Sequence, residues 1–203
     1  MTCRVTQETL RRYVQFAERG RVVVFDTETT GITNADEIIQ LAAAEYVEGR
    51  LARTLNLYLV PSRPIHPAAE EVHHISMPFL VEHGIRPVDA LQQFFDFLGA
   101  NVLLVGHNIH FDFRMLQNSC RLYDFEYLPS DVSFCDTIAF AKKMVPGLDH
   151  YRLGYLIEAL GLPGENSHNA LDDTLACGSL FFDLVQRVPI CADDYTYEPV
   201  FEA

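Results

Sequence analysis

The sequence predicts an α/β fold in which one mixed β-sheet carries helices on its faces. Three short segments, at about 22–25, 38–44 and 54–59, are apolar or alternate between apolar and polar residues, and the turns between them indicate an antiparallel meander. Two further apolar segments, at about 102–105 and 132–135, each precede a helical pattern, as in β–α units. A meander followed by such units predicts five strands in one sheet.

Length and composition favour a single domain. The chain has 203 residues, enough for a core of its own, and we expect residues 1–190 to form one domain. An acidic tail at 191–203 is expected to be disordered or to act as a docking segment. No apolar run approaches the ~18 residues that a membrane helix needs, and the N-terminus lacks the pattern of a signal peptide. We therefore expect no membrane segment. The five cysteines are scattered and never paired as Cys-x-x-Cys, which favours a reduced, cytoplasmic protein with no zinc site.

The net charge of −13 restricts the nucleic acids that the protein can bind. A broad groove for long duplex nucleic acid neutralises phosphates with Lys and Arg, and the acidic balance argues against one. The charge still permits a narrow site in which bound metal ions supply the positive charge.

Helical patterns occur along the whole chain. The first spans about 6–20, where Thr6 can cap the start and Gly20 the end. Residues 61–87 are predicted to form a connection with one short helix near 68–73. Further helices are predicted at 87–99, after Asp112, after a cap at Asp136 or Thr137, at 153–160 and at 168–188.

Two acidic residues, Asp26 and Glu28, end the first predicted strand. In an extended backbone their side chains point to the same face. Like charges at the end of a buried strand repel each other and lose hydration unless a cation holds them, and a hard divalent ion is the natural partner. The alternative is a solvated strand exit. The turn predicted at 29–31 contains a glycine, which lets a ligand approach the backbone.

A third acid, Asp112, stands at the entry to a helix that follows the strand at 102–105. On its own it is interpreted as a first-turn acid that complements the helix dipole. His107, Asn108 and His110 make this connection unusually polar. Loops at the carboxyl ends of strands are also where open α/β sheets place ligands.

A fourth acid, Asp173, lies on the last predicted helix, on the same stripe as Ala170, Cys177 and Leu180. A carboxylate on an apolar stripe is costly unless it is paired or bound to metal. His168 lies five residues before it. This histidine is interpreted either as a surface or capping residue, or as a general base with a pKa suited to neutral pH.

Three segments together resemble the motifs of a known enzyme family. FDTETTG at 25–31, GHNIHFD at 106–112 and HNALDD at 168–173 are similar to the three motifs of the DEDD exonucleases. The histidine five positions before the last aspartate indicates the His subtype. Members of this family include the ε proofreading subunit of bacterial replicative DNA polymerase. The resemblance implies a ribonuclease H-like fold, a five-stranded mixed sheet with flanking helices.

The resemblance also assigns roles to residues by their positions in the motifs. The residues that correspond to the carboxylates binding two divalent cations, Mg²⁺ or Mn²⁺, are Asp26, Glu28, Asp112 and Asp173, and His168 corresponds to the general base. The residues that correspond to contacts with the 3′-terminal nucleotide are Thr29, Thr30, Gly31 and His73, and Asn108 in the second motif is a further candidate. His74 stands where the family has a glycine, and His73 has the alternative of a helix-end histidine over the core.

The implied activity is hydrolysis of single-stranded or frayed DNA from its 3′ end with release of 5′-mononucleotides, as in proofreading, with a DNA polymerase subunit as a possible partner. Two alternatives stay open at this point. One is RNA 3′-end trimming or degradation of short oligoribonucleotides, which uses the same acids. The other is a non-catalytic module that binds a polymerase or nucleic acid.

Overall fold

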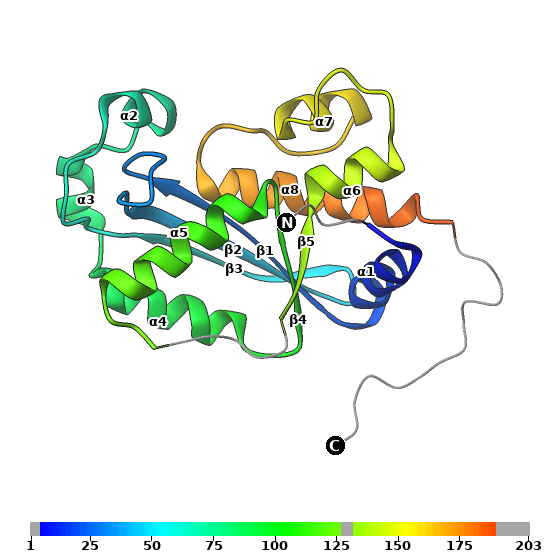
Figure 1. Ribbon diagram of the computed structural model, residues 1–203, viewed down its shortest axis with the longest axis horizontal. Coiled ribbons are helices and arrows are strands. Elements are labelled where there is room, and N and C mark those ends of the chain that lie inside the picture. Colours follow the sequence, from blue (N-terminus) through cyan, green and yellow to red (C-terminus); the bar gives the residue numbers. More distant parts are fainter. Residues whose placement is uncertain (1–4, 127–131, 190–203) are drawn as a thin grey trace.

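The computed structural model describes residues 5–126 and 132–189, so the acidic tail predicted at 191–203 lies outside the described residues. One five-stranded sheet forms the centre of the molecule (Figure 1). Its strands are β1 Arg21–Thr29, β2 Ile38–Val47, β3 Arg50–Tyr58, β4 Val102–Gly106 and β5 Val132–Asp136. Their order across the sheet is β3-β2-β1-β4-β5.

The sheet is mixed in direction, which confirms the predicted fold class. β1 pairs antiparallel with β2, and β2 pairs antiparallel with β3, so these strands form the expected meander. β4 is parallel to β1, and β5 is parallel to β4. Because parallel strands end at the same edge of a sheet, residues that follow β1 and β4 come close together there.

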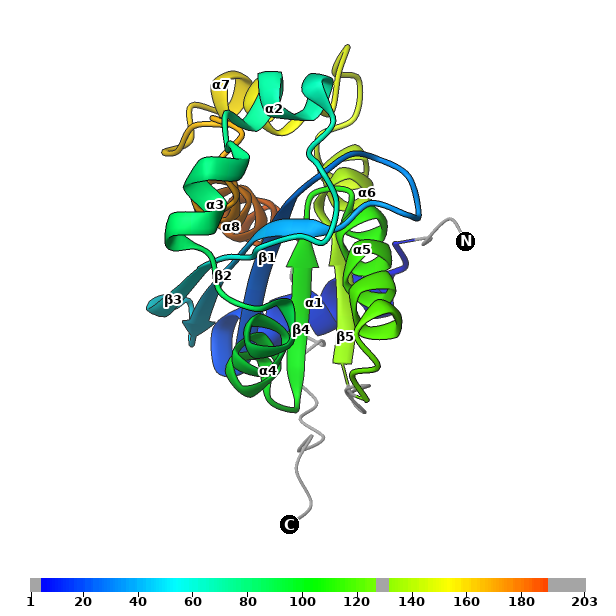
Figure 2. The same cartoon turned by 90° about the vertical axis from the view of Figure 1, so that its left-hand side faces the viewer.

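Helices cover both faces of the sheet (Figures 1 and 2). They are α1 Gln7–Arg19, α2 Pro67–His73, α3 Met77–His83, α4 Pro87–Leu98, α5 Ile109–Leu122, α6 Thr137–Met144, α7 Leu153–Leu160 and α8 Ala170–Gln186. The core on one face contains residues of α1, α6, α7 and α8, and the core on the other face contains residues of α4 and α5. Residues of α2 and α3 pack in a smaller cluster with Ile39 of β2. Among the described residues, no helix has the length and apolar character needed to cross a membrane.

Strand β1 is buried on both faces, which explains its continuous apolar run. Val22 and Val24 belong to the core under α8, whereas Phe25 belongs to the core under α4 and α5. The strand is longer than the four residues predicted, because its pairing with β2 continues to Thr29. Asp26 and Glu28 therefore lie within the strand, on the face that α8 covers.

The structure differs from the predicted helices at two places. The connection at 61–87 holds a second short helix, α3, whose start is capped by the Ser76 hydroxyl accepting from the Phe79 N–H. The last helix begins at Ala170 rather than at 168, because the Asn169 side chain caps it by accepting from the Leu171 N–H at 3.1 Å.

Helix α8 approaches the sheet closely through Gly178. A Cβ atom at this position would collide with the hydroxyl of Tyr46 on β2. The Tyr46 ring also packs on Phe182, one turn further along α8, with 4.8 Å between ring centroids. The close approach matters for the site described below, because the first turn of the same helix carries Asp173.

We expect Gly178→Ala to lower the free energy of unfolding by about 1–3 kcal/mol through overpacking. Alanine favours the helix over glycine by about 1 kcal/mol, so the opposite sign would be expected at an open position. Chemical denaturation measures the difference, and Ser179→Ala on the same turn is the matched control. A Gly178→Ala protein as stable as the wild type would show that α8 is not held this closely.

Candidate metal and catalytic site

Three carboxylates converge at the end of β1. Asp26 and Glu28 reach this point from the strand, and Asp173 reaches it from the first turn of α8. One oxygen atom from each of the three lies within 4.8 Å of the other two. The same-face prediction for Asp26 and Glu28 is therefore confirmed, and Asp173 joins them from 145 positions further along the chain than Glu28.

Asp112 lies beside this group and approaches β1 from the opposite face. Its Oδ1 accepts hydrogen bonds from the Thr27 N–H at 3.1 Å and from the Thr27 hydroxyl at 2.7 Å. Thr27 lies between Asp26 and Glu28 in the strand, so its side chain points away from theirs toward α5. Asp112 also lies close to Asp26. Of the neighbouring charges, that of Asp112 makes the largest contribution to the raised pKa of Asp26.

Burial and mutual repulsion make the charged state of these acids costly. Burial, followed by the charges of Asp112, Glu28 and Asp173, raises the pKa of Asp26 well above its ordinary value. Burial, followed by Asp173 and Asp112, raises the pKa of Glu28 from 4.5 to about 8. Burial raises the pKa of Asp112 from 3.8 to about 7 and also raises that of Asp173.

A hard divalent cation fits this set of side chains. The donors are carboxylate oxygens only, three of them lie close enough to share one ion, and each would be stabilised in its charged form by a cation. An oxygen-only set suits Mg²⁺ or Mn²⁺ better than a metal that prefers sulfur or nitrogen.

Asp173 is held by the loop that precedes α8. The Asn166 amide donates to Asp173 Oδ2 at 2.5 Å, and the Ser167 N–H donates to Asp173 Oδ1 at 3.0 Å. His168 follows directly, is exposed and has φ 55, a value uncommon outside glycine. Its charge lowers the pKa of Asp173, so the imidazole lies near that carboxylate.

The predicted substrate turn is tied firmly to its surroundings. Thr30 is buried, and its N–H donates to the Glu37 carbonyl oxygen at 2.8 Å, while its own carbonyl accepts from the His66 N–H at 2.8 Å. The Thr29 hydroxyl donates to the Gly31 carbonyl at 2.6 Å. A Cβ on Gly31 would lie 2.8 Å from the Asp36 carboxylate, so this glycine is needed for close packing within the loop.

His73 lies next to this turn and Asn108 lies beside Asp112. His73 is buried at the end of α2, and its Nδ1 accepts from the Ile75 N–H at 3.0 Å. Burial lowers its pKa, while the neighbouring Thr29 backbone acts in the opposite sense. His74 adopts the left-handed conformation, φ 57, which explains why glycine suits this position. Asn108 is exposed ahead of α5, with φ 65, and its N–H donates to Asp136.

Sequence reasoning missed the residues that hold the acids. Thr27 orients Asp112, Asn166 orients Asp173, and Gln40 on β2 accepts from the Ala170 N–H at the start of α8 at 3.2 Å. Thr27 had a detectable signal, because it lies between two candidate ligands. Gln40 had none, since its partner on α8 lies 130 positions along the chain. Asn166 had none either, because its bond to Asp173, seven positions away, depends on the course of an irregular loop.

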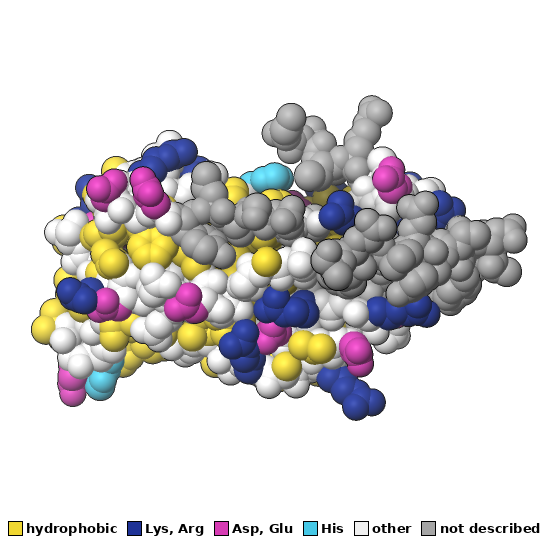
Figure 3. Space-filling view, turned by 90° about the horizontal axis from the view of Figure 1, so that it is seen from below, with side chains coloured by type: hydrophobic (Ala, Val, Ile, Leu, Met, Phe, Trp, Pro, Cys, Tyr) yellow, Lys and Arg dark blue, Asp and Glu magenta, His cyan; other side chains and the backbone are white. Residues whose placement is uncertain are grey.

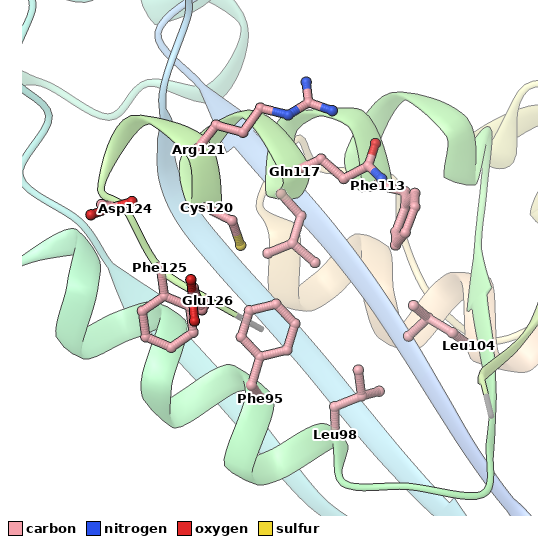
Figure 4. A pocket seen from close by; sticks show the side chains of 11 residues that line it. Phe95, Leu98, Leu104, Phe113, Gln117, Cys120, Arg121, Asp124, Phe125 and Glu126 are labelled. Carbon is pink, nitrogen blue, oxygen red and sulfur yellow. The ribbon is translucent and has the colours of Figure 1, made fainter. Parts of the chain in front are cut away.

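A cavity of about 670 Å³ lies elsewhere, between α4 and α5 (Figure 4). It is lined mainly by apolar side chains, among them Phe95, Leu98, Leu104 and Phe113, together with Cys120. None of the four clustered acids lines it. The cavity is therefore separate from the candidate site.

The raised pKa values predict how the stability of the cation-free protein depends on pH. Above the unfolded-state values near 4, the folded protein binds more protons than the unfolded chain, so stability falls as the pH rises through about 7 for Asp112 and about 8 for Glu28. The pKa values of the buried His73 and the half-buried His107 are lowered, so these two residues act in the opposite sense, but only below their ordinary pKa of 6.5.

Thermal unfolding in EDTA should therefore give a melting temperature that falls between pH 6.5 and pH 8. Saturating Mg²⁺ should remove most of this fall, and Glu28→Gln should reduce it without Mg²⁺. A melting temperature in EDTA that stays constant or rises over this range would contradict the electrostatic description of the site.

Comparison with known proteins agrees with this geometry. The family model described as Exonuclease matches residues 23–181. A PolC-type DNA polymerase III from Thermotoga petrophila is 32% identical over 174 residues, which are 84% of this chain and 12% of the polymerase. The 3′-5′ exonuclease DinG of Bacillus subtilis is 31% identical over 172 residues, 84% of this chain and 18% of that protein. The chain thus spans less than a fifth of the length of these relatives.

A solved structure of exonuclease X in complex with 5′-overhanging duplex DNA has the same fold, with a TM-score of 0.67 at 22% identity. The likeness covers 85% of this chain and 96% of that one, and it confirms the expected ribonuclease H-like architecture. Since the family model spans most of the chain, including all four clustered acids and His168, the chain belongs to the exonuclease family.

Proposed function

We propose that this domain is a metal-dependent 3′-5′ exonuclease that releases 5′-mononucleotides from single-stranded or frayed 3′ ends of DNA. The observation that carries the proposal is the convergence of Asp26, Glu28 and Asp173, with Asp112 beside them, into one partly buried group of oxygen donors. The names of the two relatives, a 3′-5′ exonuclease and a PolC-type polymerase, support the polarity and the choice of DNA.

The acids divide into two sets around Asp26. Asp26, Glu28 and Asp173 would hold one divalent cation, since their oxygens already lie together. Asp26 and Asp112 would hold a second, with Asp112 offering the oxygen that Thr27 leaves free. Two such cations would lower the pKa of the attacking water and stabilise the charge on the departing 3′ oxygen.

His168 is suited to take the proton from the attacking water. It is exposed at the entrance to the group and lies near Asp173, with its backbone held by the loop bonds to that carboxylate. A histidine at such a position is the usual general base at neutral pH. The turn at 29–31 and the neighbouring His73 would contact the terminal nucleotide, because they border the same end of β1.

The acidic balance suggests weak binding of the nucleic acid outside the site. On the face shown in Figure 3, basic side chains are interspersed with acidic and apolar ones. If few Lys and Arg side chains contact the phosphates, the affinity for DNA should depend only moderately on salt concentration. A DNA polymerase partner would supply the missing affinity, and the PolC-type relative supports that part of the proposal.

The test is digestion of 3′-labelled DNA, matched and mismatched at its end, and of RNA of the same sequence, with Mg²⁺ and then with EDTA. We expect mononucleotides from single-stranded and mismatched DNA, faster than from RNA, and no product in EDTA. Asp26→Asn and Asp173→Asn should abolish hydrolysis, because each removes a cation ligand. Asp172→Asn, the exposed neighbour on α8, is the matched control.

Wild-type turnover in either variant would remove the proposed site. Faster digestion of RNA would assign the same chemistry to RNA 3′ ends. No Mg²⁺-dependent product from any substrate would favour the non-catalytic alternative.

A separate prediction concerns His168, the proposed general base. His168→Ala should lower kcat by about 10²–10⁴-fold, the range for loss of a general base, while leaving the melting temperature close to that of the wild type. The pH–rate profile should lose its acidic limb in the same variant. An unchanged profile would assign the base to another group.

A further inference from the structure

The orientation of Asp173 depends on the loop in front of α8. This acid has only 6% of its surface exposed, and both of its oxygens accept hydrogen bonds from the loop, Oδ2 from the Asn166 amide and Oδ1 from the Ser167 N–H. With both bonds in place, Asp173 still presents an oxygen within 4.8 Å of those of Asp26 and Glu28. The two donors therefore hold the carboxylate in an orientation that completes the group.

The loop passes between two helices and approaches α8 most closely at Gly164. A Cβ on Gly154 of α7 would lie at ordinary contact distance from Asn166, 3.4 Å from its Cβ and 3.7 Å from its Oδ1, so the exposed Asn166 side chain faces this helix. Gly164 has φ 117, and a Cβ there would lie 2.9 Å from Ala176 of α8. The loop is thus held between α7 and α8, and the amide of Asn166 lies with its oxygen toward α7 and its nitrogen toward Asp173.

We propose that Asn166 is a positioning residue of the cation site: its side-chain amide, together with the Ser167 N–H, orients Asp173 toward Asp26 and Glu28. The inference rests on the proposed function, since it assumes that these acids bind a divalent cation. Asparagine suits the role because it donates a hydrogen bond without carrying a charge. A lysine or arginine at this position would neutralise Asp173 and compete with the cation.

Loss of such an outer partner of a ligating carboxylate typically costs 10–100-fold in metal affinity. We therefore expect Asn166→Ala to raise the Kd for Mn²⁺ by about 10–100-fold. The expected loss is in cation affinity and not in the chemical step, because Asp173 itself remains present. At saturating Mn²⁺, kcat should return to within about threefold of the wild type.

The experiment measures Mn²⁺ binding to the substrate-free protein by electron paramagnetic resonance, beside the cation dependence of hydrolysis. Glu165→Gln, the exposed neighbour in the same loop, is the matched control and should bind Mn²⁺ like the wild type. Asp173→Asn gives the reference for loss of the ligand. Melting temperatures in EDTA establish that each variant is folded, and a destabilised Asn166→Ala is measured below its transition.

The outcomes separate this inference from the function on which it rests. If the wild type binds Mn²⁺ and the Kd of Asn166→Ala for Mn²⁺ lies within a factor of about two of the wild-type value, Asn166 is not a positioning residue. A kcat of Asn166→Ala that stays low at saturating Mn²⁺ would also overturn the inference. A wild type that takes up no Mn²⁺ would refute the proposed function itself, and the inference with it.

Discussion

The repulsion between four buried or partly buried carboxylates governs the functional end of this molecule. Asp26 and Glu28 on β1, Asp112 on α5 and Asp173 on α8 bring four negative side chains to the end of one strand. Their raised pKa values show that the arrangement is unfavourable in the charged state without a counter-ion. A fold can hold such a group only if packing elsewhere offsets its free-energy cost and a cation reduces the repulsion between the carboxylates.

The supporting packing comes from close contacts that have nothing to do with charge. Gly178 lets α8 lie directly against Tyr46 of β2, and this contact carries Asp173 to the sheet. Neutral donors then fix the acids individually, with Thr27 on Asp112 and Asn166 on Asp173. Because these donors are uncharged, they orient the carboxylates and leave the negative potential of the site available to a cation.

The sequence predicted most of the fold and the acids, but not what holds them. Successive side chains of a strand point to opposite faces, so the shared face of Asp26 and Glu28 follows directly from their spacing of two residues. Asp173 is detectable from the sequence because a carboxylate on an apolar helix stripe is costly unless it is paired or bound to metal. The motif resemblance then assigns Asp173 and Asp112 to the same metal site. Asn166 acts through a hydrogen bond to Asp173 whose geometry depends on an irregular loop, and no periodic sequence pattern encodes that geometry. The sequence patterns predict a single short helix, near 68–73, in the connection at 61–87 and so miss helix α3, although Ser76 and Pro78 are typical signals for a helix start.

Proton release on cation binding tests the central claim most directly. Calorimetric titration of Mn²⁺ into the cation-free protein near pH 7, in buffers of different ionisation enthalpy, counts the protons that leave as the carboxylates become charged. Convergent acids that retain protons until a cation arrives predict net proton release, and this release should decline above about pH 8, where Glu28 is already charged. Binding of Mn²⁺ without proton release at pH 7 would mean that the carboxylates are already charged before the cation binds, which contradicts the raised pKa values of the site.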